Sequence, residues 1–378
     1  MKTGLYIHIP FCQKKCLYCD FPSYDHLTHL YQPYVAALCQ EISSWGGVLS
    51  GSAVDTIYIG GGTPTLLPAD SLKRVLEQVH KSFLIDEGAE ISIEANPGTV
   101  NREKLSVLMS GGVNRISFGV QSFSNELLKT IGRIHSASQA VEAVKKAQDT
   151  GFENINIDLM YGLPGQSCED LKASMIQAIS LGVTHISAYG LKVETDTPFA
   201  AMDEKGTLVL PEDDEEEEMY NFTTEYLPQH GFMRYEISNF SKPGYECRHN
   251  LKYWNFYPYI GVGAAAHSFF RHERVGNIRD VFQYITCIEK GKRPVESQEI
   301  PCIDIAMAEY IFLALRTVRG LSVLDFQEYF GRKFYPEYEK TISELMQKQL
   351  IQVKENQICL TALGMKYGNV VFRAFLPG

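Results

Sequence analysis

Short apolar runs alternate with longer amphipathic stretches from residue 4 to about residue 195. The short runs are rich in β-branched residues and predict strands at 4–9, 56–60, 90–94, 115–119, 155–159 and 185–189. The longer stretches predict helices near 30–44, 69–83, 101–109, 136–149 and 168–180, with candidate starts at Asp70, Asn101 and Ser136. This alternation predicts an α/β fold with βα units around a parallel sheet.

Six βα units predict a partial (βα)6 barrel of the TIM type. A closed barrel would need two more units from residues 211–268, and the composition of that stretch does not favour them.

Residues 300–378 follow a different pattern. Helical patterns at 305–318, 323–330 and 336–349 precede two short strands that flank Glu355-Asn356, and a final helix begins near Thr361. This order predicts a winged-helix-like module. We therefore divide the chain into a core domain at 1–235, a connecting segment at 236–299 and a C-terminal domain at 300–378.

Composition narrows the class of protein. The 378 residues are 45% hydrophobic and 21% charged, as expected for a globular protein. The formal net charge of −10, with an acidic run at 213–218 and no basic stripe, argues against a nucleic-acid binder. That run predicts the first turn of a helix that starts after Pro211. No signal-peptide segment and no stretch of 18 apolar residues is present, so we expect a cytoplasmic protein without a transmembrane segment.

Cys12, Cys16 and Cys19 form a C-x3-C-x2-C run just after the first predicted strand. This spacing offers three thiolates to a [4Fe-4S] cluster and leaves the fourth iron without a protein ligand nearby. The rival interpretation is a zinc-stabilised interaction module with His8 as fourth ligand. Zinc sites usually pair a C-x2-C with a second distant pair, which this chain lacks, and we expect His8 to be a core imidazole.

Polar or glycine-rich segments follow the other predicted strands. They are 60–65, Glu94 with Asn96, Gln121, Asp158 and Lys192. Because the carboxyl ends of parallel strands meet at one edge of the sheet, these segments predict a shared ligand site. Its glycines would let the backbone approach a zwitterionic, nucleotide-like ligand, whose ribose hydroxyls or ammonium the two carboxylates could bind. Arg133 could pair with a ligand carboxylate or form an ordinary surface ion pair.

The motifs Y-I-H-I-P-F-C at 6–12, C-L-Y-C at 16–19 and G-G-G-T-P-T at 60–65 resemble those of radical S-adenosylmethionine (SAM) proteins. The resemblance continues through 94–97, 119–123, Arg133 and 158–164, and covers nearly the whole chain. It implies a partial barrel of the radical SAM kind, SAM bound to the open iron, and an electron donor such as a flavodoxin or ferredoxin. The family positions that would hold SAM match Tyr6, Tyr18, Gly61, Gly62, Thr63, Glu94, Gln121, Arg133, Asp158 and Lys192.

Within that superfamily the chain resembles the branch of oxygen-independent coproporphyrinogen III dehydrogenases and HemW-type haem chaperones. The dehydrogenases carry a further cysteine soon after the third ligand, where this chain has Asp20-Phe21, and an arm ahead of the first strand. The run from His249 to Trp254 instead matches the H-N-x-x-Y-W signature of the chaperones.

This signature suggests how haem could be held. The His249 imidazole could be an axial haem ligand, with Cys247 as an alternative thiolate, and the rings of Tyr253 and Trp254 could pack on a porphyrin. Alternatively, His249 and Asn250 cap a turn and Trp254 is core. The resemblance favours haem binding.

The sequence therefore predicts a chaperone that binds haem, a [4Fe-4S] cluster and SAM, and passes haem to an acceptor protein of unknown identity. The alternative function is enzymatic, the oxidative decarboxylation of coproporphyrinogen III to protoporphyrinogen IX. Both functions use the same cluster, so the cysteines do not decide whether the protein is an enzyme.

Overall fold

The protein is built on a 12-stranded sheet, seen in a computed structural model that describes residues 2–49 and 51–377. The strand order is β12-β11-β10-β9-β1-β2-β3-β4-β5-β6-β8-β7, and β1 to β6 are parallel neighbours. These six strands are β1 (Thr3–Ile9), β2 (Ala53–Gly61), β3 (Leu84–Ala95), β4 (Arg115–Gln121), β5 (Asn154–Tyr161) and β6 (His185–Gly190). Further strands continue the sheet beyond β1 and β6 instead of closing it, which confirms the predicted partial barrel.

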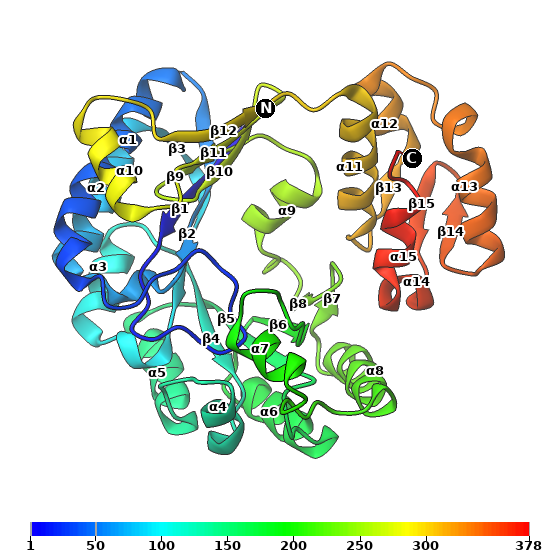
Figure 1. Cartoon of the computed structure of the whole chain (residues 1–378), viewed down its shortest axis with the longest axis horizontal. Coiled ribbons are helices and arrows are strands. Elements are labelled where there is room, and N and C mark those ends of the chain that lie inside the picture. The colour runs from blue at the N-terminus through cyan, green and yellow to red at the C-terminus, as the bar shows by residue number, and fades with distance from the viewer. Residues whose placement is uncertain (1, 50, 378) are drawn as a thin grey trace.

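The helices between these strands lie on the outer side of the sheet (Figure 1). They are α1 (Tyr31–Val48), α2 (Ala69–Ser82), α3 (Arg102–Ser110), α4 (Asn125–Thr130), α5 (Ala137–Thr150) and α6 (Cys168–Ser180), with short 3-10 turns at Thr28–Leu30, Pro64–Leu66 and Pro97–Thr99. Asn101 and Ser136 cap α3 and α5 by accepting backbone N–H hydrogen bonds, as predicted. Asp70 lies instead inside the first turn of α2, which Pro68 precedes.

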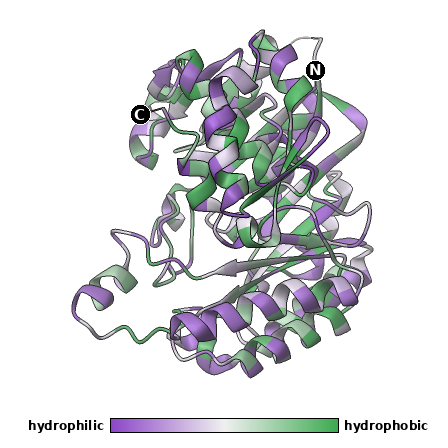
Figure 2. Cartoon of the chain, turned by 90° about the vertical axis from the view of Figure 1, so that its right-hand side faces the viewer, coloured by the Kyte–Doolittle hydropathy of each residue, from purple (hydrophilic) through white to green (hydrophobic). Residues whose placement is uncertain are grey.

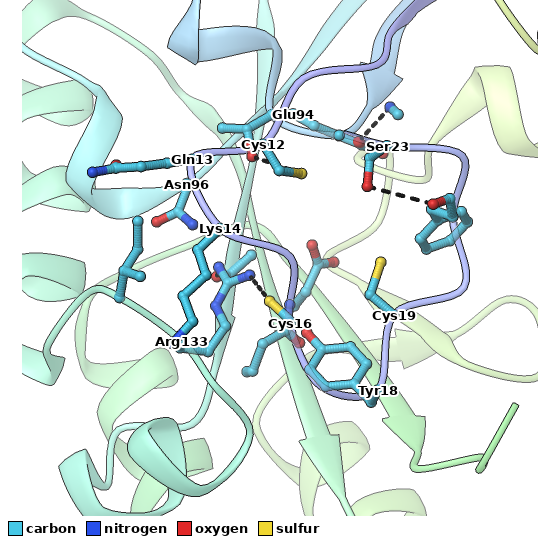
Figure 3. Close-up of a pocket in the computed structure, with 18 of the residues that line it drawn as sticks. Cys12, Gln13, Lys14, Cys16, Tyr18, Cys19, Ser23, Glu94, Asn96 and Arg133 are labelled. Carbon is cyan, nitrogen blue, oxygen red and sulfur yellow. Dashed lines mark hydrogen bonds between the residues drawn. The ribbon is translucent and has the colours of Figure 1, made fainter. Parts of the chain in front are cut away.

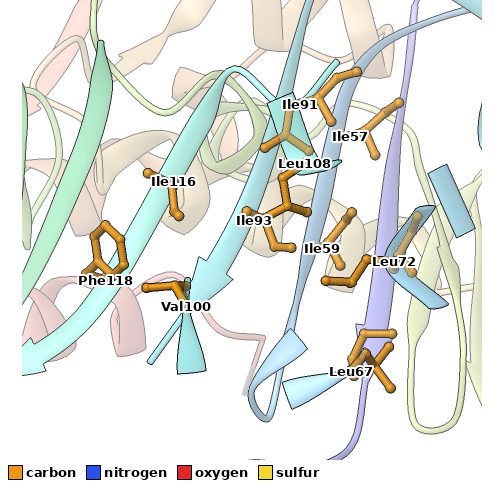
Figure 4. Packing of buried hydrophobic residues seen from close by; sticks show 14 of the residues in the cluster. Ile57, Ile59, Leu67, Leu72, Ile91, Ile93, Val100, Leu108, Ile116 and Phe118 are labelled. Atoms are coloured by element: carbon orange, nitrogen blue, oxygen red, sulfur yellow. The ribbon is translucent and has the colours of Figure 1, made fainter. Parts of the chain in front are cut away.

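The core lies between the sheet and these helices. Ile57, Ile59, Ile91 and Ile93 alternate along β2 and β3 and pack against Leu72 and Leu108 of the helices (Figure 4). Burying each such side chain stabilises the fold by about 1.5–3 kcal/mol. Hydrophilic and hydrophobic turns mix along the helices in Figure 2, because each helix buries only one face.

Residues beyond β6 extend the sheet on both sides. They form α7 (Pro198–Glu204), α8 (Asp213–Gln229), β7 (Met233–Arg234), β8 (Asn239–Ser241), α9 (Arg248–Trp254), β9 (Tyr259–Val262), β10 (His267–Phe270), β11 (Glu273–Asn277), α10 (Val281–Glu289) and β12 (Val295–Glu299). Strand β9 is parallel to β1, whereas β7, β8, β10, β11 and β12 are antiparallel to their neighbours. The stretch 211–268 thus adds no pair of βα units, and α8 begins just after Pro211, as the acidic run predicts.

A C-terminal module follows with its own hydrophobic core. Its elements are α11 (Ile303–Leu315), β13 (Leu321–Ser322), α12 (Val323–Phe330), α13 (Tyr335–Gln347), β14 (Ile351–Lys354), β15 (Gln357–Leu360), α14 (Ala362–Lys366) and α15 (Gly368–Arg373). The predicted hairpin is present, and β13 adds a third strand to it. Ion pairs from Lys366 to Glu217 and from Arg274 to Glu309 join the module to the rest of the chain.

None of the helices in residues 2–49 and 51–377 combines the length and the apolar character needed to cross a bilayer.

Candidate functional site

A cavity of about 390 Å³ lies at the carboxyl ends of the parallel strands (Figure 3). Its lining includes every residue predicted to hold the cluster or SAM except Tyr6. The predicted residues in it are Cys12, Cys16, Tyr18, Cys19, Gly61, Gly62, Thr63, Glu94, Gln121, Arg133, Asp158 and Lys192. The βα topology therefore brings together side chains that are up to 180 positions apart in the sequence.

The three cysteines lie on a loop that follows β1, and the end of this loop pairs with its beginning. The backbone N–H of Cys12 donates to the carbonyl of Tyr24 at 2.9 Å, and that of Tyr24 donates to Pro10 at 2.8 Å. The loop carries all three thiols past the strand ends (Figure 3). Burial raises the pKa of Cys12, and it raises that of Cys19 to about 11. A bound metal centre would supply the positive charge that stabilises the thiolates.

A cubane cluster and a single zinc ion need different arrangements of the three cysteines. A cubane takes each cysteine on a different iron, whereas one zinc ion needs all its ligands around a single point. Among the described residues, no group of three or more His, Cys, Asp or Glu side chains is placed to hold one metal ion. His8 is buried, with Nε2 2.9 Å from the Pro22 carbonyl and Nδ1 2.9 Å from the Tyr6 hydroxyl, so it is the core imidazole that the sequence predicts.

Arg133 lies beside the cysteine loop and not in a surface ion pair. Its Nη1 donates to Cys16 Sγ at 3.4 Å, and its Nη2 donates to the Gly119 carbonyl. Its buried Nε finds no acceptor in the described part of the chain. An arginine with a spare donor at the cavity fits an anionic ligand group such as a carboxylate.

The glycine run allows the end of β2 to pack closely against its neighbours at the cavity. A Cβ on Gly62 would lie 2.5 Å from the Phe11 carbonyl oxygen, and one on Gly60 would lie 3.0 Å from the Glu94 carboxylate. Gly61 adopts φ 113°, which side chains rarely tolerate. Gln121 also has a positive φ, of 68°, at the end of β4. Such backbone strain in a non-glycine residue is often found at functional sites.

Glu94 is held by two hydrogen bonds. Its carboxylate accepts from the Tyr58 hydroxyl at 2.9 Å and from the Gly61 N–H at 3.1 Å. Burial, followed by the charge of Asp158, raises the pKa of Glu94 to about 7. The group is therefore poised between its acid and carboxylate forms at neutral pH.

Asp158 lies deeper, among hydroxyl and amide groups of neighbouring strands. It accepts from Asn156 Nδ2 at 2.7 Å and from Ser117 Oγ at 3.3 Å, and burial raises its pKa. Ser117 and Tyr189 also line the cavity, and the sequence analysis missed them. The available signal was the period of two along each strand, which places Ser117 on the same face as Gly119.

Tyr6 and Lys192 differ from the other predicted SAM residues. Tyr6 lies outside the lining of the cavity, where its ring stacks on Tyr58 with a centroid distance of 6.4 Å. Lys192 lies in the lining but forms an ion pair with Glu194 at 2.6 Å. Unlike Glu94 and Arg133, Tyr6 does not face the cavity, and Lys192 would have to leave its ion pair to bind a ligand.

The H-N-x-x-Y-W run forms α9, which packs at the amino ends of β1, β2 and β3. His249 is fully buried, with Nδ1 2.9 Å from Thr56 Oγ1 and Nε2 2.8 Å from the Tyr253 hydroxyl. Burial, followed by the charge of Lys252, lowers the pKa of His249 to about 3. Both ring nitrogens are thus engaged away from the cavity.

The neighbours of His249 are enclosed as well. The thiol of Cys247 is buried 3.6 Å from Glu90, and burial raises its pKa to about 12. The ring of Trp254 is covered by the guanidinium of Arg316 at 4.4 Å from its centroid, and its Nε1 is buried. In this arrangement the run has the geometry of a capped, packed helix.

Tyr58 joins the two regions, and no sequence motif marked it. Its hydroxyl donates to Glu94 in the cavity lining, while its ring stacks on the His249 imidazole with a centroid distance of 5.4 Å and an interplanar angle of 26°.

Comparison with known proteins gives two family matches. The radical SAM superfamily model matches residues 6–177, and the HemN C-terminal domain model matches residues 304–366.

Curated relatives span the whole chain. The heme chaperone HemW of Bacillus subtilis (strain 168) is 39% identical over 377 residues, covering 100% of this chain and 99% of the relative. HemW of Lactococcus lactis subsp. lactis (strain IL1403) is 37% identical over 374 residues, covering 99% and 97%. Among solved structures, coproporphyrinogen III oxidase (HemN) from Escherichia coli, a radical SAM enzyme, is 25% identical with a TM-score of 0.87, covering 99% of this chain and 90% of that one.

Proposed function

This chain belongs to the HemW heme chaperone family of the radical SAM superfamily, and from this premise we propose that it binds a [4Fe-4S] cluster, SAM and haem and passes haem to an acceptor protein. The single observation that carries the proposal is the convergence of the cysteine loop and the strand-end residues on one cavity. The relatives extend over both the barrel and the C-terminal module.

The cluster ligands in this proposal are Cys12, Cys16 and Cys19, whose thiols lie on one loop beside the cavity. When bound, the cluster supplies a redox centre with one iron open to the amino and carboxylate groups of SAM. Arg133 contributes a hydrogen bond from its Nη1 to Cys16 Sγ at 3.4 Å, which fixes the position of that side chain.

The remaining cavity residues bind and orient SAM. Glu94 has lone pairs left after its bonds to Tyr58 and Gly61, and can accept from an ammonium or a ribose hydroxyl. The Arg133 Nε is a donor for a ligand carboxylate. The backbone at Gly61, Gly62 and Thr63 allows close approach, while Tyr18, Gln121, Asp158 and Lys192 complete the contact surface. Tyr6 contributes through its packing on Tyr58.

Haem contacts from His249, Tyr253 and Trp254 require α9 to move. An iron bond to His249 breaks its hydrogen bond to Thr56 or to Tyr253, each a net cost of about 0.5–1.5 kcal/mol. In this proposal the packed position of α9, with both His249 nitrogens hydrogen-bonded, is the haem-free state of the motif.

The partners follow from this chemistry. Reduction of the cluster calls for a one-electron donor such as a flavodoxin or ferredoxin, and haem calls for an acceptor protein. The cytoplasm is the compartment in which the cluster thiols stay reduced.

One observation weighs against the decarboxylase alternative. Coproporphyrinogen III carries several propionates, which need cationic partners. Of the lysines and arginines that line the cavity, Arg133 is already assigned to the carboxylate of SAM, and Lys192 is paired with Glu194. Lys14 is the remaining one in the described lining. The full-length relatives likewise favour the chaperone.

Two assays on the anaerobically reconstituted protein test the proposal. We expect stoichiometric haem uptake, followed by transfer of haem to an added apo-haemoprotein. Incubation with coproporphyrinogen III, SAM and a reductant should leave the tetrapyrrole unchanged. Haem binding no stronger than that of an unrelated acidic protein would remove the chaperone function, and protoporphyrinogen formation would establish the decarboxylase.

A further inference from the structure

A second cavity, of about 250 Å³, lies between the sheet extension and the C-terminal module. We call it the aromatic groove. It is lined by Phe256, Phe269, His272, Pro301, Ile303, Ala306, Tyr329 and Phe330.

Aromatic rings form most of its walls. The ring centroids of Phe256 and Phe269 are 4.6 Å apart, those of Phe256 and Tyr329 are 5.7 Å apart, and those of Tyr329 and Phe330 are 4.8 Å apart. Such walls suit a flat, apolar ring system. Phe256 follows α9 after one residue, so the groove begins where the H-N-x-x-Y-W helix ends.

His272 stands at the edge of this groove with one ring nitrogen held and the other available. It lies in the turn between β10 and β11, where its φ of 64° and that of Arg271, 55°, fix a tight turn. The Tyr329 hydroxyl lies 3.2 Å from His272 Nδ1. For Nε2 the structure records no hydrogen bond with any described residue, and the side chain is exposed.

This arrangement is that of a metal-binding histidine. When Nδ1–H donates to the Tyr329 oxygen, the neutral ring presents the Nε2 lone pair outward, and the second partner fixes the ring orientation. His249 offers the opposite situation, since both of its nitrogens are engaged in the interior.

We propose that the aromatic groove receives one edge of haem, with His272 Nε2 as the axial iron ligand in place of His249, whose two ring nitrogens are already hydrogen-bonded. The inference rests on the proposed function, that this protein carries haem. Pockets that enclose a ligand usually measure about 300–1,000 Å³, so a groove of about 250 Å³ holds only part of a porphyrin. A half-exposed haem suits a chaperone, because the acceptor protein can contact the porphyrin before the chaperone releases it.

Haem titration with absorption at the Soret band tests this site, using the full-length protein. We expect His272→Ala to weaken binding by about ten-fold or more and to shift the band, and Tyr329→Phe to weaken binding by about ten-fold, as the loss of a second partner does at metal sites. Ala306→Trp fills the groove and should reduce binding without touching a ligand.

His230→Ala is the matched control. His230 is also exposed, with its Nδ1 hydrogen-bonded and its ring against a tyrosine, but it directly follows α8 and lies outside the groove. It should bind haem like the wild type. Wild-type affinity in both His272→Ala and Ala306→Trp would overturn the groove, and a loss confined to His249→Ala would return the site to α9. Failure of the wild type to bind haem would instead remove the proposed function.

Discussion

Burial shifts the pKa values of polar residues both at the cavity and in α9. Loss of solvation raises the pKa of Glu94 to about 7 and that of Cys19 to about 11, because both groups are charged only when deprotonated. The same loss lowers the pKa of His249 to about 3, because histidine is charged when protonated. At neutral pH the buried His249 imidazole is therefore uncharged.

The cysteine ligands give the first test at this scale. Cys16→Ala should abolish the cluster, because two remaining thiolates do not hold a cubane that needs three or four protein ligands. Cys39→Ala removes a buried thiol on α1 and should leave the cluster intact. Iron and sulfide analysis after anaerobic reconstitution measures both. Full iron content in Cys16→Ala would reject the assignment, and zinc with little iron in the wild type would restore the zinc site.

Glu94 gives a pH-dependent prediction. A carboxylate accepts hydrogen bonds more strongly than a carboxylic acid, so SAM affinity should rise as the pH passes upward through about 7, where Glu94 loses its proton. Glu94→Gln should remove this rise and weaken binding above it by about ten- to a hundred-fold, or about 1.5–3 kcal/mol. Equilibrium binding across pH measures both effects.

Glu87→Gln is the control, because Glu87 is exposed on the same strand. SAM has its own titrating amine, so the comparison between variants, not the wild-type profile alone, isolates Glu94. An identical pH profile in Glu94→Gln and the wild type would place the SAM contacts elsewhere.

Among the secondary-structure elements, those with long amphipathic or apolar runs were predictable. The ends of β1 to β6 and of the predicted helices between them were within four residues of the sequence expectation, except that β3 starts six residues earlier than predicted, because burial of one face imposes the period. Strands β7 to β13 and helices α4, α7, α9 and α10 were not predicted. Their sequences are short, and their partners are remote in the chain: β9 pairs with β1. No local pattern reports such a pairing.

Helix α9 depends on an unpredicted contact of this kind. Glu90 of β3 accepts from the backbone N–H of Arg248 at 2.9 Å and from that of His249 at 3.1 Å, so it caps the helix from another element. Glu90→Ala should destabilise the protein by about 0.5–2 kcal/mol and speed hydrogen exchange in residues 248–254. Exchange mass spectrometry and urea unfolding measure these effects. Glu87→Ala should change neither, and unaltered exchange in Glu90→Ala would show that the helix stands without its cap.

For the molecule as a whole, the sequence predicted where the cavity lies, but not how α9 and the C-terminal module pack against the sheet. Parallel βα topology brings the strand ends together, so Glu94, Gln121 and Asp158 could be grouped without knowing any contact. The placement of α9 at the amino ends of the strands could not be derived, because it depends on packing against β2 and the C-terminal module. The aromatic groove forms only once that module is docked.

Docking of the module gives the last prediction. Arg316 of the module covers the ring of Trp254 and lies 3.6 Å from the buried carboxylate of Glu236, so it contacts two parts of the connecting segment at once. Arg316→Ala should leave that carboxylate without its ion-pair partner and loosen the module, at a cost of about 3–5 kcal/mol if the burial persists.

The fluorescence of Trp254 reports this change directly. The chain has two tryptophans, so a Trp45→Phe background isolates the signal. We expect Arg316→Ala to shift the emission of Trp254 to the red and to lower the urea midpoint of the module. Arg319→Ala removes an exposed arginine that pairs with Asp325 inside the module, and should leave the emission unchanged. An unshifted emission and an unchanged midpoint in Arg316→Ala would contradict this prediction. Arg316 would then contribute nothing measurable to the interface, and apolar contacts alone would hold the module.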